Sequence, residues 1–308
     1  MKYRLHLSYL LIAIFCLLLG GCSGSSSASR KEHSGPPRDS TPRVLTPSAD
    51  GVTVYQNDFA SIDTSNTSQG YVMVKYNGTN EKVKLQITCP DQSCYTYLIS
   101  DRGAYDTFPL TAGNGSYALQ VLENVAGDTY TVSLAQSINV NIEDEFLPFL
   151  YPNQYVNFHT DSKAVSKGSD LAKDTYSDLD VVQNIYNYVI KNISYDTEKA
   201  KNVSYGYVPD IDDTLSSKKG ICFDYAALMA SMLRSQNIPT KLEVGYSGDA
   251  YHAWISTYID DKGWVDDIIQ FNGDTWQIMD PTLAATNDSA AVKKYIGDGS
   301  HYVVKYTY

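Results

Sequence analysis

The chain has 308 residues, with 24 basic and 35 acidic side chains and a formal net charge of −11. Removal of a leader that contains Lys2 and Arg4 makes the remainder still more acidic, at −13. A negatively charged surface repels phosphate groups, which argues against nucleic acid and anionic lipid as partners. Cationic or amine-bearing substrates fit this charge better.

The N-terminus predicts a lipoprotein leader. Lys2 and Arg4 precede an apolar run over residues 7–19, and the Leu-Gly-Gly-Cys that ends at Cys22 resembles a bacterial lipobox. The run is shorter than the roughly 20 residues of a membrane-spanning helix. We expect a signal peptide over residues 1–21, a lipid on Cys22 and an exported protein anchored at the cell membrane. A plain secretion signal and a membrane span are the alternatives.

Residues 22–49 are rich in Ser, Pro, Gly and charge and have no apolar periodicity, which predicts a disordered tether. Residues 50–143 then predict an all-β domain. Short runs of alternating polarity, separated by Asn-Gly, Gly-Asn-Gly and Ala-Gly-Asp turn signals, indicate a small Ig-like β-sandwich. It would bind a ligand, act as a spacer or only support the fold. The runs are 71–76, 83–88, 95–99, 117–122 and 129–134.

Cys89 and Cys94 lie close together in this β region. In an exported protein the two thiols are a candidate disulfide, which would close a loop at the edge of a strand. A metal site is the weaker alternative, because no second Cys or His pair lies nearby. No 12-residue loop of the EF-hand kind occurs either, so we expect no cofactor or metal.

Residues 144–308 predict a second domain that opens with helices. Leu179, Val182, Ile185, Tyr186 and Val189 form one apolar stripe, which predicts a helix over residues 178–191. Ser177 and Asp180 have the spacing of a capping box at its start. The acidic cluster at 210–213 is either solvated surface or a device that steers a lysine or diamine toward the site.

The most informative stretch is 220–228, in which a glycine precedes Cys222 at the start of a helix. Unpaired amides and the positive end of the helix dipole favour the nucleophilic thiolate at that position. The helix should run over residues 222–236, end at Asn237 and Pro239, and be buried, because it has almost no polar face. The alternative interpretation is that Cys222 is only a small apolar residue buried in the core.

Two alternating runs, 241–246 and 252–259, predict strands after this helix, and His252 and Trp254 should share one strand face. A further strand over 275–279 leads to Asp280, which Pro281 would place at a sheet end. An imidazole beside Cys222 would hold its proton, and a carboxylate would orient the ring. Taken by itself, a lone histidine usually has a structural role, and an Asp-Pro pair usually forms a turn.

The Gly-Ile-Cys at the helix start, the His-Ala-Trp at 252–254 and the Asp-Pro-Thr at 280–282 together resemble the transglutaminase-like superfamily, over roughly residues 147–308. The resemblance implies an α+β fold, in which a central helix packs on an antiparallel sheet. It implies Cys222 as nucleophile, His252 as general base and acid, and Asp280 as the orienting residue. The chain departs from many members by a longer insert before Asp280, whose Asp266 and Asp267 compete for that last role.

Three functional interpretations follow. A thiol hydrolase would pass a Cys222 thioester of a peptide or amide to water, and this interpretation is preferred for an exported protein. A transglutaminase would pass the thioester to a lysine amine and so cross-link proteins. A surface binding module would keep the scaffold without turnover. A tyrosine is expected to assist the Cys222 amide with an oxyanion. The candidates are Tyr195, Tyr205, Tyr207, Tyr225 and Tyr251.

Overall fold

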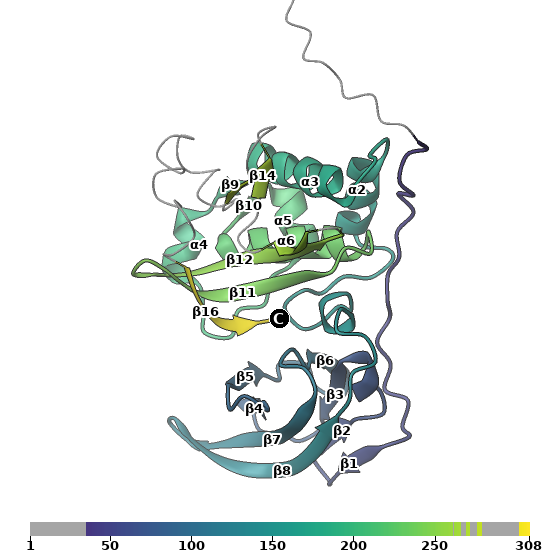
Figure 1. Cartoon of the computed structure of the whole chain (residues 1–308). Coiled ribbons are helices and arrows are strands. Elements are labelled where there is room, and N and C mark those ends of the chain that lie inside the picture. Colours follow the sequence, from purple (N-terminus) through teal and green to yellow (C-terminus); the bar gives the residue numbers. More distant parts are fainter. Residues whose placement is uncertain (1–34, 261, 266–268, 272–275, 279–301) are drawn as a thin grey trace, which may run out of the picture. The chain divides into compact units, whose positions relative to one another are not determined.

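A computed structural model describes residues 35–260, 262–265, 269–271, 276–278 and 302–308 of the chain (Figure 1). Contacts divide the chain into residues 1–36 and a compact unit of residues 37–308. Cys22 and Asp280 lie outside the described residues. Within the described part of the chain, no helix is long and apolar enough to cross a membrane.

The predicted β domain consists of two four-stranded antiparallel sheets, with strand orders β1-β2-β3-β6 and β5-β4-β7-β8 (Figure 1). In β4 every second side chain is buried in the core, whereas all side chains of β2 and nearly all of β3 are buried. The predicted strands are confirmed, and β7 and β8 are longer than expected. The strands are β1 (Val54–Gln56), β2 (Ala60–Asp63), β3 (Tyr71–Tyr76), β4 (Val83–Thr88), β5 (Cys94–Leu98), β6 (Tyr105–Pro109), β7 (Gly115–Ala126) and β8 (Thr129–Val140).

The predicted disulfide between Cys89 and Cys94 is not formed, and both thiols are free. The amide of Cys89 donates to the carbonyl of Ser93 at the end of the β4–β5 hairpin, while Thr88 pairs with Cys94. Neighbouring residues of a strand point to opposite faces of the sheet. This register therefore buries Cys89 in the core and exposes Cys94 to solvent.

The predicted tether is also shorter than expected, because residues 38–43 are held along the helices that follow the β domain and Ser48 bonds to the β domain itself. The amides of Arg38 and Arg43 donate to the carbonyls of Thr175 and Ser235, each at 2.7 Å. The guanidinium of Arg38 also pairs with Asp178 at 2.6 Å. The composition of this segment indicated disorder, but its backbone and arginines find partners that are remote in the sequence.

The α+β architecture of residues 147–308 is confirmed. The helix α6 (Cys222–Arg234) contacts β11 (Thr240–Ser247) and β12 (Ala250–Ile259), the two central strands of an antiparallel sheet (Figure 1). The sheet order is β13-β12-β11-β16, with β13 (Gly263–Val265) and β16 (Tyr302–Thr307). Every side chain of α6 from Asp224 to Arg234 is buried, as its apolar composition predicts.

Shorter elements surround α6. The helix α3 (Asp178–Asn192) begins with the predicted capping box, in which Ser177 and Asp180 exchange hydrogen bonds. The other described elements are η1 (Thr67–Gln69), η2 (Leu147–Phe149), α2 (Lys163–Ala172), β9 (Ser194–Tyr195), α4 (Thr197–Asn202), α5 (Ile211–Ser217), β10 (Lys219–Gly220), β14 (Ile269–Phe271) and β15 (Trp276–Ile278).

Candidate active site

Cys222 is the first residue of α6, and its position follows from the elements just before it. Strand β10 pairs in parallel with β9 and leads the chain into Ile221, the extended N-cap residue of the helix. A side chain at Gly220 would lie 2.7 Å from Cβ of Asp224, so this position needs glycine for close approach rather than for a turn. The thiol is half-buried, and its amide belongs to the first turn, whose N–H groups have no acceptor within the helix.

His252 lies on β12, directly opposite Gly245 of β11. Its ring stacks on that of Trp254, two residues along the same strand, with centroids 6.2 Å apart. The predicted shared face is therefore confirmed. Trp254 is almost fully buried and is not among the residues that line the pocket described next.

Cys222 and His252 both line one pocket of about 380 Å³. The structure thus brings together two residues that are 30 positions apart in the sequence. Tyr195, Tyr207 and Tyr251 of the tyrosines that the sequence singled out also line this pocket. The remaining lining residues are aromatic or small: Tyr155, Ala200, Val203, Ser204, Gly206, Ile221, Phe223, Val244, Ala253 and Tyr308.

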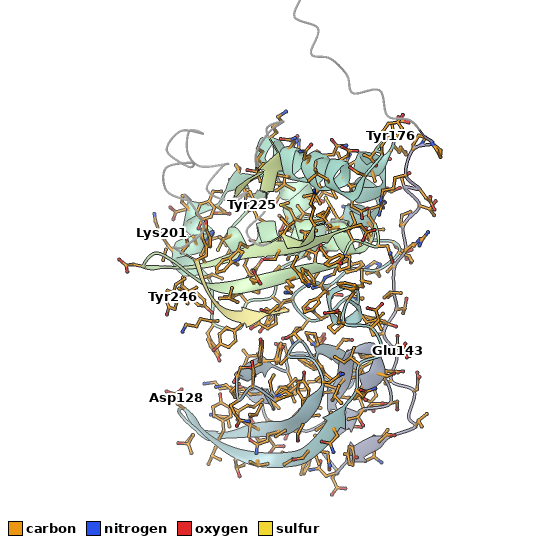
Figure 2. All side chains as sticks on the ribbon, in the orientation of Figure 1. Asp128, Glu143, Tyr176, Lys201, Tyr225 and Tyr246 are labelled. Atoms are coloured by element: carbon orange, nitrogen blue, oxygen red, sulfur yellow. The ribbon has the colours of Figure 1, made fainter. Side chains whose placement is uncertain are left out.

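The other two tyrosines do not line the pocket. Tyr225 is buried, and its hydroxyl donates to the carbonyl of Ile193 at 2.7 Å, in the interior of the domain (Figure 2). Tyr205 is largely exposed, and the ammonium of Lys84 lies 5.6 Å from its ring centroid. The pocket tyrosines whose pKa is raised by burial stay protonated and uncharged at neutral pH. Burial raises the pKa of Tyr207 to about 12, and it raises those of Tyr155 and Tyr251 as well.

The acidic cluster at 210–213 caps helices and does not line the pocket. Asp210 is the N-cap of α5, and its carboxylate accepts from the amides of Asp212 and Asp213. The carboxylate of Asp212 in turn accepts from the amides of Lys163 at 2.9 Å and Ala164 at 3.0 Å, which begin α2. Asp210 and Asp213 are exposed, as the solvated-surface interpretation expects, and the structure adds the capping of helices as a role of the cluster.

The sequence did not reveal a polar cluster that includes the pocket residue Tyr207. Asp224, in the first turn of α6, is completely buried, and Lys199 of α4 pairs with its carboxylate at 2.8 Å. The hydroxyl of Tyr207 donates to the same carboxylate. A signal existed, because an acidic side chain that follows Cys222 in an apolar helix needs either a cap or a cation. Nothing local indicated that Lys199 would supply the cation.

Comparisons with known proteins agree with this arrangement. The UPF0252 protein MJ1282 of Methanocaldococcus jannaschii is 31% identical over 118 residues, which cover 33% of this chain and 34% of the relative. The chain therefore spans about a third of the length of that curated relative. Residues 166–266, which include Cys222 and His252, match the model of the transglutaminase-like superfamily. The chain thus contains a transglutaminase-like superfamily domain.

The matches among solved structures have low identity and low TM-scores. A candidate cysteine protease from Cytophaga hutchinsonii is 15% identical, with a TM-score of 0.35 and coverage of 75% of this chain and 69% of that one. The periplasmic domain of TgpA from Pseudomonas aeruginosa is 15% identical, with a TM-score of 0.35 and coverage of 83% and 86%. Red sea bream transglutaminase is 15% identical, with a TM-score of 0.28 and coverage of 69% and 48%.

Proposed function

We propose that the protein is a thiol enzyme that cleaves a peptide or amide through a thioester on Cys222. The observation that carries the proposal is that Cys222, at the first position of α6, and His252, on β12, line the same pocket. A thiol at a helix N-terminus with an imidazole in the same cavity is the arrangement that nucleophilic catalysis requires.

The proposed reaction has two halves. The thiolate of Cys222 attacks the carbonyl carbon, the Cys222 amide donates to the developing oxyanion, and the C–N bond breaks as the imidazolium of His252 gives its proton to the leaving amine. Water then attacks the thioester while His252 takes a proton from it. The S–C bond breaks, the acid leaves, and thiolate and imidazolium are restored. Asp280 is proposed to orient the imidazole.

The lining of the pocket supports an acyl donor with an uncharged group beside the cleaved bond. Among the described lining residues, none is Asp, Glu, Lys or Arg, and the aromatic rings offer apolar surface. Since the acidic cluster at 210–213 caps α2 and α5, no described feature favours amine capture over hydrolysis. We therefore prefer water as the acceptor.

Iodoacetamide alkylation tests the nucleophile. The full chain, purified in detergent, is compared with His252→Ala over a range of pH, and mass spectrometry locates the label. Alkylation at Cys222 should persist well below the free-thiol pKa of about 8.5, and the His252 change should abolish this low-pH reaction. Reaction that is equal in both proteins would refute the ion pair and favour a binding module.

The acceptor is tested separately with peptide amides in ¹⁸O-labelled water that also contains a dansylated diamine. Hydrolysis places ¹⁸O in the released acid, whereas transfer produces a dansylated amide. Cys222→Ser should lose both products, because a hydroxyl is not ionised at neutral pH. A predominance of the dansylated product would replace the hydrolase by a cross-linking transglutaminase.

We also propose that Cys22 carries a lipid and that the protein works on peptides or proteins at the outer face of a cell membrane. The proposal is motivated by the apolar run over 7–19 and the Leu-Gly-Gly-Cys that follows it. In cells fed an alkyne-tagged palmitate, the full chain should acquire the tag and sediment with membranes. Cys22→Ser should remove the tag, and a tagged Cys22→Ser protein would contradict the assignment.

A further inference from the structure

A buried carboxylate lies two residues beyond the nucleophile. Asp224 has no exposed surface, and three groups from different segments satisfy its two oxygens. Oδ2 accepts from the Ile221 amide at 2.8 Å and pairs with the Lys199 ammonium at 2.8 Å. Oδ1 accepts from the hydroxyl of Tyr207. The carboxylate therefore holds both the turn that enters α6 and a residue that lines the pocket.

This carboxylate creates an electrostatic conflict. A negative charge in the first turn stabilises a helix, but it also repels a thiolate at the first position of the same turn. An unpaired Asp224 would thus oppose the ionisation that the reaction requires. Loss of its partner would also leave a fully buried charge without compensation.

Lys199 resolves the conflict because its ammonium lies at the buried carboxylate. Burial disfavours the charged ammonium, yet its hydrogen bonds to Asp224 and Tyr207 outweigh that effect and raise the pKa of Lys199. The ammonium also lies 4.4 Å from the centroid of the Tyr207 ring. Its side chain keeps about a quarter of its surface exposed, at 27%, so the position tolerates substitution better than Asp224 does.

The other titratable groups that line the pocket with Cys222 come from several elements, and they are His252 on β12 and five tyrosines. Burial raises the pKa of Tyr155, Tyr207, Tyr251 and Tyr308, so these remain neutral there. Tyr195 is the fifth tyrosine among the lining residues of this pocket. Asp224 is the acidic residue in the first turn of α6, so the charge that remains after it pairs with Lys199 acts on a thiolate at the start of this helix.

We propose that Lys199 is a positioning residue that neutralises Asp224, so that the carboxylate fixes the start of α6 and the Tyr207 segment without placing net negative charge beside Cys222. This inference rests on the proposed function of Cys222. Lys199 acts through Asp224 and takes no part in bond making or breaking.

The test measures iodoacetamide alkylation of Cys222 in the full chain, as the ratio of the rate at about pH 6.5 to that at about pH 9. Lys199→Met should lower this ratio on the order of tenfold, because a nearby uncompensated like charge shifts an ionisation by about a pH unit or more. Lys199→Arg should preserve the ratio. Asp224→Asn removes the negative charge and keeps the positive charge of Lys199, so it should raise the ratio or leave it unchanged.

The double variant Lys199→Met/Asp224→Asn separates charge compensation from a merely structural role. Removal of both charges should restore the ratio to within about threefold of the parent protein. If the pair only supported the fold, the double variant would lose at least as much as the worse single variant. Lys201→Met is the matched control: Lys201 lies on the same helix α4, pairs with Glu198 and is exposed (Figure 2). It should leave the ratio unchanged.

Thermal unfolding of each variant identifies those that are folded at the assay temperature. Lys199→Met is expected to lower the ratio and Asp224→Asn is expected not to lower it, so either variant in folded form can overturn the proposal. An unchanged ratio in Lys199→Met, or a lowered ratio in Asp224→Asn, overturns the proposal. If the parent ratio itself does not depend on His252, the proposed function fails, and this outcome is distinct from failure of the Lys199 assignment.

Discussion

At the residue scale, the three described cysteines differ because of their surroundings. Cys222 lines a pocket at the first position of α6, whereas Cys89 is buried in the β core and Cys94 is exposed. Burial raises the pKa of Cys89 to about 11. A thiol of that kind stays protonated at neutral pH, where it is neither a nucleophile nor a metal ligand.

Iodoacetamide at about pH 8 should therefore label Cys94 of the native protein and spare Cys89, with both labelled after denaturation. The reason is that the reagent requires an accessible thiolate, and a group that ionises near pH 11 provides almost none at pH 8. Peptide mass spectrometry without reductant gives the answer. Absence of label on both residues until a reductant is added would show that the chain forms the disulfide after all.

At the scale of elements, carboxylates at helix starts organise the region around the site. Asp180 caps α3, Asp210 caps α5, Asp212 caps α2 and Asp224 fixes the entry into α6. Each satisfies amides that a helix N-terminus leaves without an acceptor. The acidic character of the chain is thus partly a consequence of its helices, and charge alone is a weak guide to its substrate.

Asp212→Ala should lower the free energy of unfolding by about 1–2 kcal/mol, because the amides of Lys163 and Ala164 lose their acceptor. Asp213→Ala is the matched control, since this exposed neighbour should change stability by less than about 0.5 kcal/mol. Urea denaturation measures both. Equal effects would show that the Asp212 cap contributes nothing to stability.

At the scale of the whole compact unit, one buried guanidinium joins segments that are distant in the sequence. Arg234, at the end of α6, donates to the carbonyls of Thr240, Tyr151 and Tyr308 at 2.7–2.9 Å. Burial lowers its pKa to about 9, so it remains charged at neutral pH. Thr240 belongs to β11, Tyr151 lies in the segment that enters the domain, and Tyr308 follows β16. One side chain thus joins three segments.

Arg234→Met should destabilise the protein by about 3 kcal/mol or more, because it removes the donors of three hydrogen bonds at once, although the Tyr308 oxygen keeps a second donor, the Leu242 amide. The loss should appear as a lower midpoint in urea with an unchanged slope. Arg43→Met is the comparison, since Arg43 is exposed and its 3.8 Å pair with Asp39 is weak. A loss below about 1 kcal/mol for Arg234→Met would refute the structural role.

Through β5 and the segment between β6 and β7, the β domain also contacts β16 and the residue after it, in the sheet of the site. The Thr111 hydroxyl donates to the carbonyl of Thr307 at 2.8 Å, and the Thr307 amide donates to the hydroxyl of Tyr95 at 3.2 Å. The rings of Tyr95 and Tyr308 meet edge to face with centroids 5.7 Å apart. Among the three roles open to the β domain, these contacts support a role in holding the fold.

Local pattern was sufficient for the elements that carry the site. The apolar run of α6, the Ser177 capping box, and the alternation of β11 and β12 each depend on neighbours within a few positions. Tertiary structure decided what depended on remote partners: the pairing of Lys199 with Asp224 and the docking of the segment that contains Arg38 and Arg43. Such contacts join residues tens to hundreds of positions apart, and a local pattern carries no record of which distant group satisfies a buried charge or an unpaired amide.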